Sequence, residues 1–148
     1  MSFLWWSRDY AKGSRAISGP DLAAALRDAF AGHAFALQLD DGAYRAIPAD
    51  SFAEMVERFR WDDPPPHPQK FDCDDYAATF LADLRRAWAN HSKCDEALAF
   101  GSAWVQFGGH TDTHRLIWQY DGAKVHLWEP QSNKRTAQAL GVVYEVRA

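Results

Sequence analysis

The segment from Asp72 to His91 constrains the fold of this chain more than any other. Its apolar side chains recur every three or four residues and form one stripe of a helix. The stripe consists of Tyr76, Ala77, Phe80, Leu81, Leu84 and Trp88. Asp72 stands directly before it and is a favourable N-cap residue. We therefore predict a long amphipathic helix that begins after Asp72 and packs its apolar stripe against the rest of the protein.

Two further helices and a hairpin are predicted ahead of this segment. Residues 18–32 have helical spacing with a serine and a proline at their start. Residues 34–48 alternate around a central Asp-Gly pair, which is typical of a hairpin. A second helix is predicted over residues 50–61, with Glu54 placed for a capping box. The proline-rich residues 62–69 then predict a stiff, extended connector.

The second half of the chain predicts an antiparallel sheet. Residues 102–109, 113–120, 124–130 and 141–146 are rich in aromatic and β-branched side chains and are separated by Gly-containing or polar turns. We therefore expect an α+β fold with a meander of four strands, in a single domain over residues 1–148. The expected core is Phe80, Leu84, Trp88, Val105, Leu116, Trp118, Leu127 and Val143.

Composition excludes several classes of partner. Sixteen Lys and Arg against twenty Asp and Glu give a net charge of −4. Because binding to phosphate backbones depends on clustered cations, no nucleic-acid partner is expected. No apolar run approaches the ~18 to 20 residues of a membrane span. The apolar run Phe3 to Trp6 is too short for a signal peptide, so a cytoplasmic location is expected.

The two cysteines are expected to be free thiols. Cys73 and Cys94 are twenty-one residues apart, and most of the segment between them is the predicted long helix. At 1.5 Å per residue such a helix separates them by up to ~30 Å, whereas bridged Cα atoms lie within ~7 Å.

Cys73 is the first candidate for chemistry because it falls at the first position of the long helix. The free N–H groups of a helix start favour a thiolate, whereas the neighbouring acids Asp72, Asp74 and Asp75 oppose it. A small buried side chain without reactivity is the alternative for this cysteine.

A base and an orienting acid are available on two predicted strands. His114 begins the strand 113–120, and Glu129 lies near the end of the strand 124–130. A turn at Asp121–Gly122 would pair these strands antiparallel and place Glu129 opposite the neighbourhood of His114. Cys73, His114 and Glu129 could therefore converge as nucleophile, base and orienting acid.

These motifs resemble those of a known superfamily. The sequence FDCDDYA at residues 71–77, a histidine strand, an Asp-Gly turn and WEPQS at residues 128–132 are similar to the transglutaminase-like and papain-like cysteine hydrolases. The resemblance is strongest to small bacterial and phage proteins with DC-acidic, His-strand and EPQ boxes.

The resemblance implies a fold, a reaction and a set of residues. The implied fold is a central helix that starts at Cys73 and packs on an antiparallel sheet of four or more strands. The implied function is a thiol hydrolase or acyl transferase that acts on an amide bond of a peptide or protein, without a cofactor. Cys73 would be the nucleophile, His114 the base and Glu129 the orienting acid. Gln69 and the backbone N–H of Cys73 are candidate oxyanion donors.

Two alternatives remain open at this point. The first is a catalytically inactive binding or inhibitor module of the same fold, which docks a host protein or a glycan through exposed aromatic side chains. The second is a metal site, because His110, Asp112 and His114 would share one face of an extended segment.

The acidic residues at the helix start are expected to be structural. We predict that Asp72 caps the helix and that Asp74 faces solvent. Asp75 is expected either to complete a capping box or to pair with a cation such as Lys70.

Overall fold

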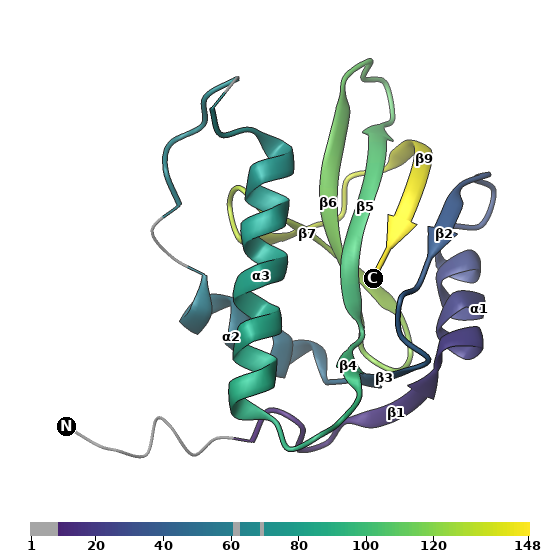
Figure 1. Ribbon diagram of the computed structural model, residues 1–148. Helices are drawn as coiled ribbons and strands as arrows, with labels where there is room; N and C mark the ends of the chain where they lie inside the picture. The colour runs from purple at the N-terminus through teal and green to yellow at the C-terminus, as the bar shows by residue number, and fades with distance from the viewer. Residues whose placement is uncertain (1–8, 61–62, 69) are drawn as a thin grey trace.

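The computed structural model describes residues 9–60, 63–68 and 70–148. The described residues form a three-stranded sheet in the order β1-β3-β4 and a six-stranded sheet in the order β2-β9-β5-β6-β7-β8 (Figure 1). The elements are β1 Arg15–Ser18, α1 Gly19–Ala29, β2 Ala36–Gln38, β3 Ala43–Ala46, α2 Ala49–Phe59, α3 Cys73–His91, β4 Ala97–Leu98, β5 Phe100–Phe107, β6 Thr113–Tyr120, β7 Val125–Glu129, β8 Lys134–Thr136 and β9 Leu140–Arg147.

Helix α3 has the start that its sequence predicts, and the predicted stripe is buried except for Leu81, which is partly buried. It begins at Cys73, and the side chain of Asp72 accepts a hydrogen bond from the backbone N–H of Asp74 at 3.2 Å. Asp75 accepts in turn from the backbone N–H of Asp72 at 3.1 Å, which completes a capping box. The buried residues are Tyr76, Ala77, Phe80, Leu84, Ala87 and Trp88.

The other two helices differ in how they start. Helix α1 is capped by Ser18, whose hydroxyl accepts from the N–H of Asp21, as its sequence indicates. Helix α2 begins at Ala49 after Pro48 and has no side-chain cap, so the predicted capping box is wrong. Glu54 instead forms an ion pair with Arg58, one turn later on the same helix. The predicted end of this helix at residue 61 lies outside the described residues.

Four predicted strands correspond to β5, β6, β7 and β9, and their pairs are antiparallel. Their order is not a simple meander, because β9 returns to lie between β5 and β2. Gly101 allows this close approach, since a Cβ at that position would overlap the carbonyl oxygen of Arg147. Strand β8 forms between residues 130 and 141, where the sequence predicts only a polar turn, and it adds a strand beside β7.

The predicted hairpin over residues 34–48 is wrong. Its two extended runs are β2 and β3, which belong to different sheets and do not pair with each other. Strand β2 pairs in parallel with β9, and β3 pairs with β1 and, in parallel, with β4. The local alternation predicts extended backbone correctly but does not specify the pairing partner, which is distant in sequence.

The predicted fold class is also wrong. We expected an α+β papain-like or transglutaminase-like fold with a central helix on one antiparallel sheet. The described structure instead has two sheets, and each contains a parallel pair. The parallel pairs join residues that are far apart in the chain, and periodicity within one segment carries no signal for them.

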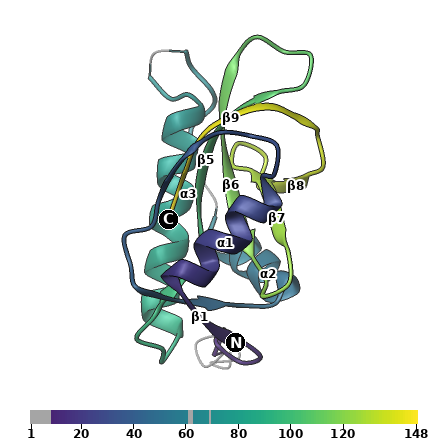
Figure 2. The same ribbon diagram turned by 90° about the vertical axis from the view of Figure 1, so that its right-hand side faces the viewer.

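Two groups of buried apolar residues lie on opposite faces of the six-stranded sheet. Helices α2 and α3 cover one face, where Ile117 and Trp128 are buried. Helix α1 covers the other face, where Leu116 and Trp118 are buried, and Figure 2 shows this helix in front of the sheet. The predicted core residues are buried except Leu127, which is only partly buried.

Arg60 connects the end of α2 to the rest of the structure. Its side chain is fully buried, and its guanidinium donates to Asp83 at 2.9 Å and to Asp63 at 2.6 Å. It also donates to the carbonyl of Pro130 at 3.1 Å and to the side-chain oxygen of Asn133 at 3.1 Å. Because a buried cation is stable only when its donors are paired, this group fixes the positions of α2, α3 and the β7–β8 turn relative to one another.

Within the described residues, no helix is both long enough and apolar enough to cross a bilayer.

Replacing Arg60 with Ala should strongly destabilise the fold. The substitution leaves two carboxylates and a buried carbonyl without their cation, and we expect a loss of about 3 kcal/mol in the free energy of unfolding. Urea denaturation followed by tryptophan fluorescence measures this loss. Arg86→Ala, at an exposed position of α3, is the control and should lie within ~0.5 kcal/mol of the parent chain. Equal effects of the two substitutions would contradict the structural role of Arg60.

Candidate functional site

His114 and Glu129 form a close pair on adjacent strands. The Nε2 atom of His114 lies 2.6 Å from Oε2 of Glu129, and both side chains are about three-quarters buried. Their strands pair in the register Ile117 with Trp128, so both side chains lie where the β6–β7 ladder ends. The structure therefore brings together two of the residues that the sequence singled out.

The surroundings hold both side chains in place. The second carboxylate oxygen of Glu129 accepts a hydrogen bond from the N–H of Gln131 at 3.2 Å. The ring of His114 lies 5.6 Å from that of Phe107 between centroids. In the described part of the chain, Nδ1 of His114 has no hydrogen bond, so this nitrogen is the one available to accept a proton or bind a ligand.

Cys73 lies at the adjoining start of α3 and is only partly buried. Burial raises the pKa of its thiol, and the charges of Asp74 and Asp72 raise it further. A hydrogen bond from the backbone N–H of Arg115 and the charge of that arginine lower the pKa, but the net direction is upward. Cys73 thus contacts the residue next to His114, while no hydrogen bond joins the two side chains in the described structure.

Arg115 is a residue of this region whose role was not predicted from the sequence. Its Nε donates to Asp74 at 2.9 Å, and its Nη1 donates to Ser102 at 3.2 Å. Its guanidinium also lies over the ring of Trp104, 5.0 Å from the centroid. A single cation inside an apolar strand, together with acids at a nearby helix start, was the signal that could have revealed this link.

Asp74 faces solvent as predicted, with a side chain that is 57% exposed. It also pairs with Arg115, an ion pair that the sequence did not predict and that joins the start of α3 to β6. Asp72 and Asp75 have the predicted capping roles. Both cysteines are free thiols, as predicted.

The remaining predicted site residues do not gather into one centre. Gln69 lies outside the described residues. His110 is near Gln138, with 3.4 Å between their side-chain nitrogens, whereas His114 is bound to Glu129. Among the described residues no group of three metal-ligating side chains is present, so His110, Asp112 and His114 do not form the alternative metal site.

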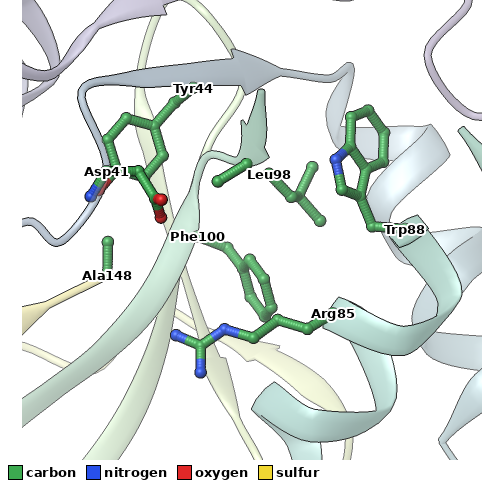
Figure 3. A pocket seen from close by; sticks show the side chains of 8 residues that line it. Asp41, Tyr44, Arg85, Trp88, Leu98, Phe100 and Ala148 are labelled. Carbon is green, nitrogen blue, oxygen red and sulfur yellow. The ribbon is translucent and has the colours of Figure 1, made fainter. Parts of the chain in front are cut away.

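A separate pocket lies between α3, β4, β5 and the loop before β3 (Figure 3). Its volume is about 220 Å³. It is lined by Asp41, Tyr44, Arg85, Trp88, Ala97, Leu98, Phe100 and Ala148. This pocket is not predictable from local sequence patterns, because its walls come from segments that are distant along the chain.

Comparisons with known proteins give structural neighbours only. No family model and no curated protein matches the sequence. A solved structure described as a PSL1a–E64 complex is similar, with a TM-score of 0.76, 22% identity and coverage of 90% of this chain and 50% of that chain. A Polyporus squamosus lectin bound to the human-type influenza-binding epitope Neu5Acα2-6Galβ1-4GlcNAc has a TM-score of 0.69 and 22% identity, over 87% of this chain and 49% of that chain.

These neighbours correct the family prediction. The similar fold is that of about half of each neighbouring structure, one of which is described as a lectin, and this finding contradicts the resemblance to transglutaminase-like and papain-like cysteine hydrolases. The same finding contradicts the implied thiol hydrolase or acyl transferase and its inactive variant of the same fold. It also contradicts the peptide or protein amide partner. Short boxes such as FDCDDYA specify a helix start and a few side chains, and such patterns recur on different folds. This chain spans about half the length of its structural neighbours.

Replacement of Asp72 and replacement of Asp74, both at the start of α3, should differ in their effect on the free energy of unfolding. Asp72→Ala removes the N-cap and should cost about 1 kcal/mol in the free energy of unfolding. Asp74→Ala removes an ion pair whose carboxylate side chain is 57% exposed, and it should cost less than ~0.5 kcal/mol. Urea denaturation of both variants checks this difference. A larger loss for Asp74→Ala than for Asp72→Ala would show that the link to Arg115 matters more than the cap.

Proposed function

We propose that this chain binds carbohydrate. The observation that carries the proposal is the similarity of its fold to a lectin solved with a bound sialylated trisaccharide, at a TM-score of 0.69. The neighbour is about twice as long as the matched region, and the proposal assigns glycan binding to the part that the two chains share. Sugar sites combine apolar or aromatic walls with a few fixed polar groups, and the pocket of Figure 3 offers both.

Titration of the purified chain with glycans tests this proposal. We expect saturable heat in isothermal titration calorimetry with Neu5Acα2-6Galβ1-4GlcNAc. A glucose disaccharide at the same concentration serves as the control and should give only heat of dilution. Absence of saturation with the sialylated trisaccharide and with its neutral part, Galβ1-4GlcNAc, would reject carbohydrate binding by this chain.

The contact between His114 and Glu129 favours a second candidate function, a reactive-thiol site. We propose that Cys73 is its nucleophile, that His114 accepts the thiol proton and that Glu129 orients the imidazole. The bond of Nε2 to Glu129 fixes the ring and leaves Nδ1 for the thiol. Because burial raises the pKa of Cys73, a thiol without such a base would be mostly protonated at neutral pH. Gln69 remains a predicted hydrogen-bond donor at this site.

Alkylation rates test the reactive thiol. In the reaction with iodoacetamide, the sulfur of Cys73 forms a bond to carbon, iodide leaves, and His114 takes the thiol proton. Cys94 is an internal control because burial also raises the pKa of its thiol. At pH 7, mass spectrometry should show Cys73 reacting roughly ten times faster than Cys94 or more, because a positioned general base contributes at least that factor.

Two variants and one change of pH sharpen this experiment. His114→Ala should remove the advantage of Cys73 at pH 7, and Glu129→Gln should reduce it in part. Above the raised pKa of Cys73 its thiolate forms without a base, so the difference between the parent chain and His114→Ala should disappear at high pH. Equal rates for Cys73 in the parent chain and in His114→Ala at pH 7 would reject the role of His114.

A further inference from the structure

We infer that the pocket of Figure 3 binds the carboxylate-bearing residue of an acidic glycan, and that Arg85 binds the carboxylate. The inference rests on the proposed carbohydrate binding and assigns it a location and a ligand class. It concerns a part of the fold separate from Cys73, since Arg85 lies more than three turns further along α3.

Arg85 differs from the arginines that pair with carboxylates in this structure. Arg45, Arg60 and Arg115 each form an ion pair with Asp or Glu. In the described residues, the contact of Arg85 is with the ring of Phe100, whose centroid lies 5.9 Å from the guanidinium carbon. An exposed guanidinium beside an aromatic face keeps its forked donors available for a ligand carboxylate.

Asp41 provides the opposite charge on another wall of the same pocket. Its backbone N–H donates to the hydroxyl of Tyr44 at 3.0 Å, which fixes this loop, while its carboxylate has no hydrogen bond among the described residues. Figure 3 shows Asp41 and Arg85 on different sides of the open space, and no ion pair joins them in the described structure. The two charged groups are therefore both available to one ligand that lies between them.

The remaining walls are mostly apolar and buried. Trp88, Leu98 and Phe100 are buried, and the indole N–H of Trp88 donates to the carbonyl of Glu96 at 3.0 Å. The volume of about 220 Å³ lies below the ~300 Å³ at which pockets for drug-sized ligands begin. The pocket therefore suits one sugar residue of a glycan rather than a whole oligosaccharide.

A sugar that carries a carboxylate fits this combination of groups. Its carboxylate accepts from the guanidinium of Arg85, its hydroxyls donate to the carboxylate of Asp41, and the C–H face of its ring lies on the apolar wall. A neutral sugar would use Asp41 and the apolar wall but would leave Arg85 without a partner. The glycan of the lectin neighbour carries such an acidic residue, Neu5Ac.

A comparison of two adjacent arginines tests the inference. Free Neu5Ac and Neu5Acα2-6Galβ1-4GlcNAc are titrated into the parent chain, Arg85→Gln and Arg86→Gln, and binding is followed by calorimetry and by NMR shifts. Both positions are exposed on α3, but Arg86 does not line the pocket, so Arg86→Gln controls for the loss of one positive charge. Arg85→Gln should weaken binding of both acidic ligands about tenfold or more, and Arg86→Gln should leave it unchanged.

The outcomes separate this inference from the function on which it rests. If the parent chain binds the glycan and Arg85→Gln binds it equally well, the pocket assignment is wrong while carbohydrate binding stands. If the parent chain binds neither acidic nor neutral glycan, the proposed function fails and this inference fails with it. If acetate binds as tightly as Neu5Ac, the pocket recognises only a carboxylate, and its assignment to a sugar is overturned.

Discussion

The buried guanidinium of Arg60 is the contact on which the arrangement of this domain depends. Because water cannot solvate this guanidinium, its N–H groups must donate to protein acceptors. These acceptors lie just after the end of α2, on α3 and in the turn after β7. The same turn follows Glu129 directly, and the acceptor Pro130 is its neighbour. One side chain therefore links the packing of two helices to the turn that follows the carboxylate bound to His114.

The sequence was informative where structure is decided within a few residues. The cap of α3 at Asp72 and the strands β5, β6 and β7 follow from local signals of charge, spacing and alternation. It was uninformative where two distant segments must meet. Three features depend on contacts between distant segments: the strand partners of β2 and β3, the ion pair of Arg115 with Asp74, and the pocket around Arg85. Alternation says that a segment is extended, but it does not say which strand lies beside it.

The candidate site shows the same division between local and distant information. Two strands joined by a short turn bring His114 and Glu129 together, and this pairing could be predicted from their spacing around residues 121–122. The family and the reaction could not be read from the same few side chains. A cysteine at a helix start with a histidine on a strand is a local arrangement, and the structural neighbours share the fold of this chain over about half of their length at only 22% identity.

The position of β9 has a consequence for the order of events during synthesis. Strand β2 pairs with β9 alone in the six-stranded sheet, and β9 also completes the hydrogen bonding of β5. During synthesis, residues 36–38 therefore cannot form their parallel pair with β9 until residues 145–147 have left the ribosome. Until then the apolar face under α1 lacks Val143 and Val146. The nascent chain thus carries an incomplete sheet until β9 has been synthesised, and closure of this long loop is a late step in the folding of the sheet.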